Sequence, residues 1–204
     1  MKNMTLTEFA DKVASNEPVP GGGSVAAVCG TISAALSEMV ARLTIGKKKY
    51  AEHEDEMKEI LEKALNLRNV LIDYIEKDSI AYNKVMEAYK LPKETEEEKY
   101  IRKQAIEESS KLAATVPLEV AEISFEILPL SEAVVVKGNT NAVTDGLVAA
   151  MLARTAVLSA ILNVRINLSS INDQDFVRTC KEKADELEAK TVSYEKKILE
   201  NSPF

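Results

Sequence analysis

Apolar residues recur along most of the chain at spacings of three and four, the period of an α-helix. Start and stop signals divide this pattern into six helices. They cover about residues 6–15, 23–44, 52–89, 96–137, 141–168 and 173–200. The fourth contains Pro117 and Pro129, so we expect a kink or a break in it, and Gly138 is expected to end it.

Two of these helices, residues 23–44 and 141–168, are apolar or small on nearly every side. Such a helix belongs in the interior, and its Ala, Ser and Gly residues let neighbouring backbones approach closely. Four other helices can hardly cover two of this kind in one copy of the chain. The sequence is therefore compatible with a homodimer and with a monomer that has two buried helices.

The totals fit a single domain spanning residues 1–204. A chain of 204 residues with 46% hydrophobic and 5% aromatic residues can bury a sizeable core without disulfides or metal. Alternating stretches are short and lack a partner, so no sheet is expected. We predict an all-α bundle of about six helices.

Charge and composition exclude several classes of protein. A net charge of -7 does not favour nucleic-acid binding. The apolar run over residues 142–164 is interrupted by Asp145, Arg154 and Asn163, and the first residues do not resemble a signal peptide, so we expect a soluble protein without a membrane partner. Cys29 and Cys180 stand alone, as suits the cytoplasm, and with one histidine no metal site is expected.

The segment "PVPGGGSVAA" contains Gly21, Gly22, Gly23 and Ser24. It lacks the preceding strand that a dinucleotide-binding loop requires, and the later Gly-Lys pair at residues 46–47 lacks the rest of a P-loop. Two interpretations remain open. The free amides at a helix start can bind a carboxylate or a polar ligand, or the glycines can form a tight turn between packed helices.

Asp78 interrupts an apolar stripe formed by Leu71, Ile75, Tyr82, Val85 and Tyr89. A carboxylate on an apolar face must be paired, hydrogen-bonded or protonated, and burial raises its pKa toward the range useful for proton transfer. Asp78 is therefore a candidate acid/base, with a structural ion pair or helix cap as the alternative.

Other polar residues in apolar surroundings are weaker candidates, and each has a structural alternative. Asp145 can stabilise a helix start, Arg154 and Arg165 can hold a substrate carboxylate or pair with buried acids, and Asn163 and Asn167 can bind a heterocycle or join helices. The lysines Lys47, Lys48 and Lys49 would suit a polyanionic tail or simply form a solvated turn.

Seven motifs together resemble the cyclodeaminase/cyclohydrolase family. In chain order they are "PVPGGGSVAA", "LTIGKKKY", "KDSIAYNKVMEAYKLPK", "TEEEKYIRKQAI", "VPLEVAE", "KGNTNAVTDG" and "LNVRINL". The resemblance covers about residues 6–176 and implies an all-α dimer with a tetrahydrofolate-binding cleft near the glycine segment and the subunit interface. It also implies that the aspartate of "DSIAY", Asp78, is catalytic.

Together with the candidates found from the residues themselves, the candidate substrate-binding residues are Gly21, Gly22, Gly23, Ser24, Lys47, Lys48, Asn139, Asp145, Asn163 and Asn167. The implied reaction converts 5-formiminotetrahydrofolate to 5,10-methenyltetrahydrofolate and ammonia, with no cofactor. A cyclohydrolase on the same scaffold is the first alternative. A non-catalytic folate-binding or interaction module is the second.

Overall fold

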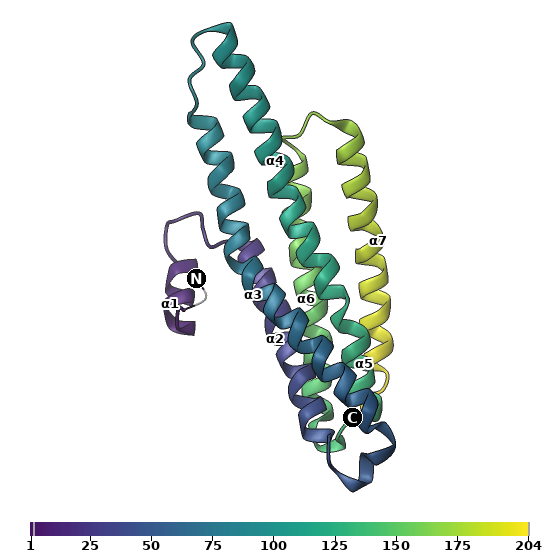
Figure 1. Ribbon diagram of the computed structural model, residues 1–204. Coiled ribbons are helices and arrows are strands. Elements are labelled where there is room, and N and C mark those ends of the chain that lie inside the picture. Colours follow the sequence, from purple (N-terminus) through teal and green to yellow (C-terminus); the bar gives the residue numbers. More distant parts are fainter. Residues whose placement is uncertain (2, 204) are drawn as a thin grey trace.

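The computed structural model describes residues 1 and 3–203 and contains all six expected helices (Figure 1). In chain order the elements are α1 (Leu6–Val13), α2 (Gly22–Thr44), the 3-10 helix η1 (Lys48–His53), α3 (Glu54–Lys90), α4 (Glu96–Phe125), α5 (Ile127–Lys137), the 3-10 helix η2 (Thr140–Ala142), α6 (Val143–Leu168) and α7 (Gln174–Leu199). No strand occurs within the described residues, so the all-α prediction is confirmed.

The predicted fourth helix is divided at Glu126 into α4 and α5. Pro117 lies inside α4 without interrupting it, whereas the break falls three residues before Pro129. Since Pro129 has no N–H to donate to the residue four positions earlier, it leaves a carbonyl at the end of α4 without its helical partner. Gly138 caps α5, as expected from the sequence.

The helices α2 and α6 pack side by side and share a buried contact. Ala26, Ala34, Ala150 and Ala153 are completely buried, and the buried Ser33 hydroxyl donates to the Ala149 carbonyl at 2.7 Å. Both helices are long and apolar enough to span a membrane, but about half of each apolar segment is covered by the bundle itself. Length and hydropathy are therefore weak evidence for a membrane here.

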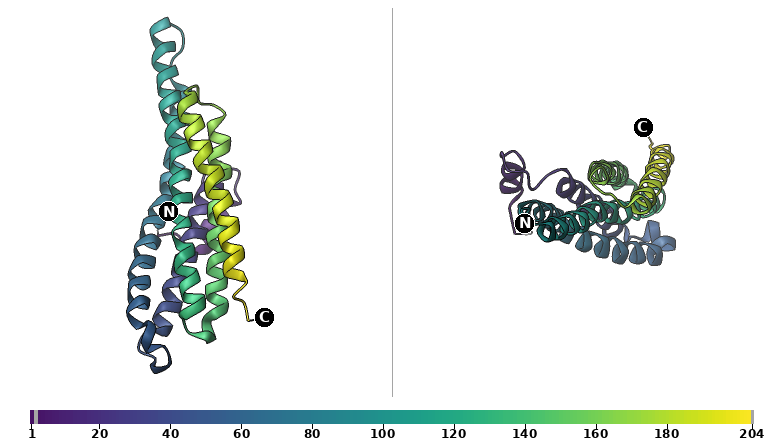
Figure 2. Two further views of the ribbon diagram at one scale, coloured as in Figure 1. Left: turned by 90° about the vertical axis from the view of Figure 1, so that its right-hand side faces the viewer. Right: turned by 90° about the horizontal axis from the view of Figure 1, so that it is seen from above.

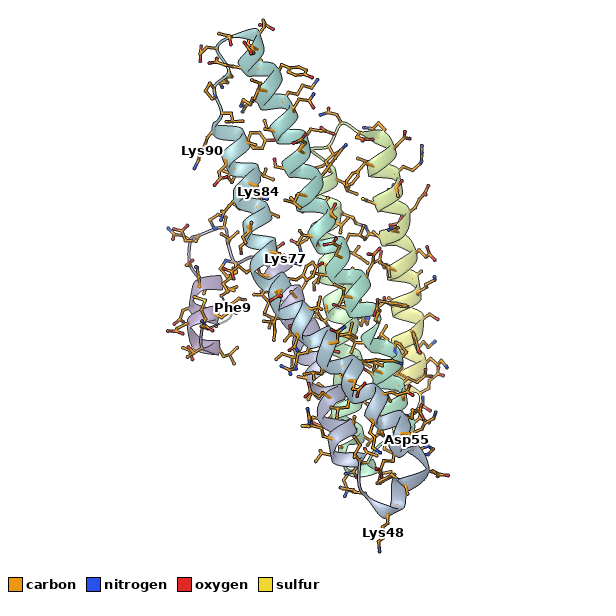
Figure 3. The ribbon with its side chains drawn as sticks, in the orientation of Figure 1. Phe9, Lys48, Asp55, Lys77, Lys84 and Lys90 are labelled. Atoms are coloured by element: carbon orange, nitrogen blue, oxygen red, sulfur yellow. The ribbon has the colours of Figure 1, made fainter. Side chains whose placement is uncertain are left out.

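Two parts of the chain extend beyond this packed region. The end of α3 and the start of α4 project as a pair past α2 and α6, while α1 stands beside the bundle with no buried residue (Figures 1 and 2). Lys84 and Lys90 mark the projecting pair, and Lys48 marks the opposite end of the molecule (Figure 3). Tyr89 lies on the projection and is 46% exposed, so the apolar stripe predicted for α3 contacts the bundle only as far as Val85.

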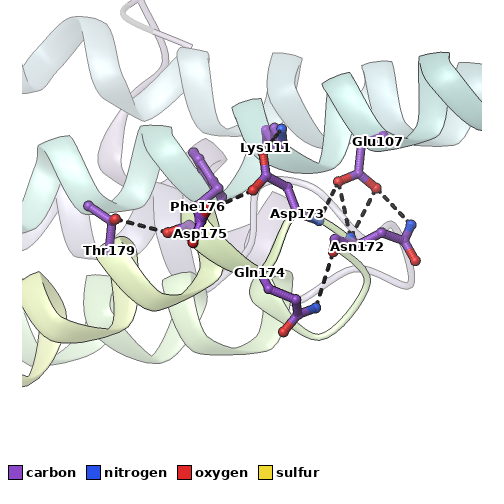
Figure 4. Close-up of polar contacts among 8 residues, drawn as sticks. All are labelled: Glu107, Lys111, Asn172, Asp173, Gln174, Asp175, Phe176 and Thr179. Atoms are coloured by element: carbon purple, nitrogen blue, oxygen red, sulfur yellow. Dashed lines mark hydrogen bonds and ion pairs between the residues drawn. The ribbon is translucent and has the colours of Figure 1, made fainter.

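Polar contacts fasten the turn between α6 and α7 to α4 (Figure 4). The Glu107 carboxylate accepts hydrogen bonds from the backbone N–H groups of Asn172 and Asp173, each at 3.0 Å. Asp173 caps α7 by accepting from the Phe176 N–H, and it pairs with Lys111 at 2.6 Å. This junction fixes the end of α6, the helix that carries Asn163 and Asn167.

Candidate functional site

A cleft of about 330 Å³ opens where the start of α2 meets the middle of α3 and the end of α6. Its lining combines bare backbone, apolar side chains and a few polar groups. The residues are Pro18, Val19, Gly21, Gly22, Gly23, Asp78, Tyr82, Val85, Ala113, Asn163, Ile166 and Asn167. Four segments that are far apart in sequence therefore meet around one carboxyl group, that of Asp78.

Asp78 lies half-buried in this cleft, against the first turn of α2. The Ser24 hydroxyl is 3.1 Å from Asp78 Oδ2, and the Ser24 backbone N–H also donates to the carboxyl group. Burial raises the pKa of Asp78 above its ordinary value, and the two hydrogen bonds from Ser24 oppose that rise. The group can therefore hold a proton at higher pH than a solvated aspartate.

Gly22 and Gly23 allow the start of α2 to lie this close to Asp78. A Cβ atom on Gly23 would lie 2.5 Å from Asp78 Cγ and 2.8 Å from Oδ2, distances that real Cβ atoms do not show. A Cβ atom on Gly22 would lie 3.2 Å from the Asn163 side-chain nitrogen. The bare backbone thus lets α2 begin directly against α3 and α6, so close packing accounts for Gly23.

Asn163 and Asn167 face the same cleft, as their spacing of four on one helix predicts. The Nδ2 group of Asn163 donates to the Ser159 carbonyl at 2.8 Å, and that of Asn167 donates to the Ala113 carbonyl at 2.6 Å. These bonds hold the two side chains in place. Within the described chain the amide oxygens accept no hydrogen bond, so they remain available to a ligand.

The structure does not bring Lys47, Lys48, Asn139 and Asp145 to the Asp78 cleft of the same chain. They lie near the far end of α2, which is about 33 Å long at 1.5 Å per residue. The polar groups of Asn139 are already used: its backbone N–H donates to Thr44 Oγ1, its Nδ2 donates to the Leu43 carbonyl, and its Oδ1 accepts from Asn141.

The two arginines have structural partners on α7. Arg154 lies 3.3 Å from a Glu195 carboxylate oxygen, and Arg165 pairs with both Asp185 and Glu188. Neither lines the cleft. Of the two interpretations of Arg154 and Arg165, the structure supports pairing with an acidic side chain and not a role in holding a substrate carboxylate.

Sequence reasoning missed part of the lining. Tyr82 and Val85 could have been found, because they lie four and seven residues after Asp78 and so share its helix face. Pro18 and Val19 belong to the segment "PVPGGGSVAA" but were not named as site residues, and Ala113 gave no signal, since its position depends on how α4 packs. The involvement of Ser79, whose hydroxyl lies 3.3 Å from that of Ser24, was equally invisible in the sequence.

Comparisons with known proteins give matches over most of the chain. The family described as "Formiminotransferase-cyclodeaminase" matches residues 5–186. A methenyltetrahydrofolate cyclohydrolase of Methylorubrum extorquens is 41% identical over 97% of this chain and 95% of its own length. The formimidoyltransferase-cyclodeaminase of Mus musculus is 33% identical over 84% of this chain, and this match spans only 32% of that longer protein.

Among solved structures, the formiminotetrahydrofolate cyclodeaminase of Thermotoga maritima has the same fold. The two chains superpose with a TM-score of 0.88 at 35% sequence identity, over 98% of this chain and 96% of the other. Both the sequence and the fold therefore match over nearly the whole length. The chain belongs to the formiminotransferase-cyclodeaminase family.

Proposed function

We propose that this protein is an enzyme that acts on a tetrahydrofolate derivative, and that it is a formiminotetrahydrofolate cyclodeaminase. The observation that carries the proposal is the Asp78 carboxyl group, which is half-buried and faces a cleft between α2, α3 and α6. The match to a cyclodeaminase over nearly the whole chain supports it.

The proposed reaction needs proton transfer at two nitrogens. N10 of 5-formiminotetrahydrofolate attacks the formimino carbon and loses its proton, which closes a five-membered ring. The tetrahedral intermediate then expels ammonia once the leaving nitrogen has been protonated, and 5,10-methenyltetrahydrofolate remains. Asp78 with a raised pKa suits this transfer, for which a positioned acid/base contributes roughly 10²–10⁴-fold. The balance includes no electron transfer, and we propose that no cofactor takes part.

The cleft supplies the second requirement, which is to hold the reacting atoms close together. The amide oxygens of Asn163 and Asn167 can accept hydrogen bonds from the N–H groups of a heterocycle, and Tyr82 and Val85 offer apolar contact. We propose these residues, with Gly22, as substrate-binding groups. Gly21 lines the cleft as backbone, while Gly23 and Ser24 act through their contact with Asp78.

A methenyltetrahydrofolate cyclohydrolase is the second candidate, favoured by the relative that is 41% identical over nearly its entire length. It would use the same carbon and the same acid/base, with water as the nucleophile. A non-catalytic folate-binding module on this scaffold is the third, and it requires that Asp78 be replaceable without chemical consequence.

One absorbance assay separates the three candidates. Methenyltetrahydrofolate absorbs in the near ultraviolet, so its formation from 5-formiminotetrahydrofolate and its hydrolysis can each be followed. We expect wild type and Asp55→Asn to form it with ammonia release, and Asp78→Asn to lose turnover. Asp55 is a suitable control because it lies on the same helix with its side chain 98% exposed. Hydrolysis without formation would favour the cyclohydrolase, and full activity in Asp78→Asn would overturn the catalytic role.

We also propose that the protein is a homodimer that joins through α2 and α6. Each helix carries exposed apolar side chains: Ile32 and Leu43 on α2 are 47% and 43% exposed, and Leu162 and Ile166 on α6 are 64% and 68% exposed. Large apolar side chains exposed on two neighbouring helices are typical of an interface. Ile166 also lines the cleft, so the cleft borders this surface.

A dimer would also change the role of the distant candidates. In a two-fold arrangement with α2 antiparallel to its partner copy, the far end of one subunit approaches the cleft of the other. We propose that Lys47, Lys48 and Asp145 act there, on a substrate held by the partner, while Asn139 shapes the turn that presents them. A cytoplasmic location without a nucleic-acid or membrane partner completes the proposal.

A further inference from the structure

The Ser24 hydroxyl, which is completely buried, has three oxygen neighbours. The Ile75 carbonyl lies at 2.9 Å, Asp78 Oδ2 at 3.1 Å and Ser79 Oγ at 3.3 Å. A hydroxyl carries one proton and can therefore donate one of these bonds, while it accepts others through its lone pairs. The number of protons on Ser24 and Asp78 therefore limits which of these contacts can be hydrogen bonds at the same time.

The Ile75 carbonyl can only accept, and so can a charged Asp78 carboxylate, so these two acceptors compete for the single Ser24 proton. While Ser24 donates to Ile75, a hydrogen bond between Ser24 Oγ and Asp78 Oδ2 needs a proton from the carboxyl side. A carboxylic acid can supply that proton, whereas a carboxylate cannot. The contacts therefore fit both protonation states of Asp78: the Ser24 proton goes to Oδ2 when Asp78 is charged, and to the Ile75 carbonyl when Asp78 is neutral.

We propose that Ser24 is a positioning residue that supports Asp78 in both protonation states by turning its hydroxyl between two acceptors. While Asp78 holds its proton, Ser24 accepts from the carboxylic acid and donates to Ile75. After Asp78 has given that proton to the leaving nitrogen, Ser24 turns and donates its own proton to the carboxylate. Ser24 never loses its proton, and the Ile75 carbonyl keeps the helical bond from the Ser79 N–H.

No other charged side chain lines this cleft, and the only other titratable lining residue in the described chain is Tyr82 on α3. The lining residues contributed by α2, α4, α6 and the loop before α2 are uncharged. Of the charges next to Asp78 on α3, Glu76 pairs with the N-terminal ammonium and Lys77 lies over the Tyr74 ring. Ser24 is thus the polar side chain that can influence the protonation of Asp78.

The role of Ser24 in turnover rests on the proposed function, but its contact with Asp78 can be tested without turnover. Carboxyl ¹³C NMR follows the titration of Asp78 directly in the folded protein, and Asp78→Asn assigns the resonance. Hydrogen bonds to a charged group are stronger than those to a neutral one, so Ser24→Ala removes more support from the carboxylate than from the acid. We expect its titration midpoint to rise by roughly half a pH unit or more.

Ser79→Ala is the matched control, because it removes a buried hydroxyl from the same group without removing a contact to Asp78. We expect its midpoint to stay at the wild-type value. An unchanged or lowered midpoint in Ser24→Ala, or an equal rise in Ser79→Ala, would overturn the inference. If folate turnover is found, the pH profile of kcat should shift with the NMR midpoint. If no folate derivative reacts, the proposed function fails while the NMR result still decides the role of Ser24.

Discussion

The contact between Gly23 and Asp78 makes Gly23→Ala the most informative single substitution. The added Cβ would lie 2.5 Å from Asp78 Cγ, whereas ordinary contact begins at 3.4 Å. The carboxyl group must therefore retreat by about 1 Å, a displacement that can cost on the order of 10²-fold in rate. We expect kcat to fall by about that factor, and the methenyltetrahydrofolate absorbance assay measures it.

The same substitution should leave the protein folded. Overpacking costs about 1–3 kcal/mol, and replacing a helical glycine with alanine returns up to about 1 kcal/mol. The net loss of about 0–3 kcal/mol corresponds to a fall in Tm of at most roughly 12 °C for a chain of this length. Circular dichroism melting checks this value and separates displacement of Asp78 from unfolding.

Gly22→Ala is the matched control. Its Cβ would lie 3.2 Å from Asn163 Nδ2, the end of a side chain that can move, so we expect kcat to stay within about threefold of wild type while KM rises. Gly22→Val, which is larger, should block binding. A folded Gly23→Ala protein with wild-type kcat would refute the reasoning, because Asp78 could then move without consequence.

Three further predictions concern stability and assembly. Because burial raises the pKa of Asp78, the contribution of this residue to stability is present at low pH and is lost as pH rises through the folded-state pKa. Asp78→Asn should therefore melt at a higher temperature than wild type at pH 7, and this difference should disappear in acid. Leu162→Glu should convert a dimer to monomers in sedimentation equilibrium, since it puts a charge on the apolar surface, whereas dimers that persist would place the interface elsewhere. Gly30→Ala should lower the unfolding free energy by about 1–3 kcal/mol in urea titration, because its Cβ would lie 2.6 Å from Ser124 Oγ, and an unchanged value would show that this contact relaxes.

Local signals explain why much of the fold could be predicted. Thr5 and Thr95 each form the capping box that their sequence indicates. The small-residue pattern of α2 and α6 predicted buried helices, and about half of each apolar segment is buried. These features depend on neighbouring residues. The break at Glu126 was placed less well, because two prolines were available and only Pro129 interrupts the helix.

The candidate site depended more on tertiary packing. The periodicity of α3 indicated Asp78, and the spacing of Asn163 and Asn167 placed both on one face. Neither signal could show that Ser24 touches Asp78 across 54 positions of sequence. The family motifs grouped Lys48 with these residues, but in one chain a long helix separates it from them.

The projecting pair formed by α3 and α4 gives the two halves of α3 different local stability. Before Asp78, α3 packs against α2 and other parts of the bundle, as the buried Leu71 illustrates. Beyond Val85, α4 is its main neighbour (Figure 1). Opening by local unfolding therefore costs less free energy along the outer half. Asp78 lies near this boundary. The cleft is therefore bordered by the more stable part of α3 on one side and by the part that unfolds locally at lower cost on the other.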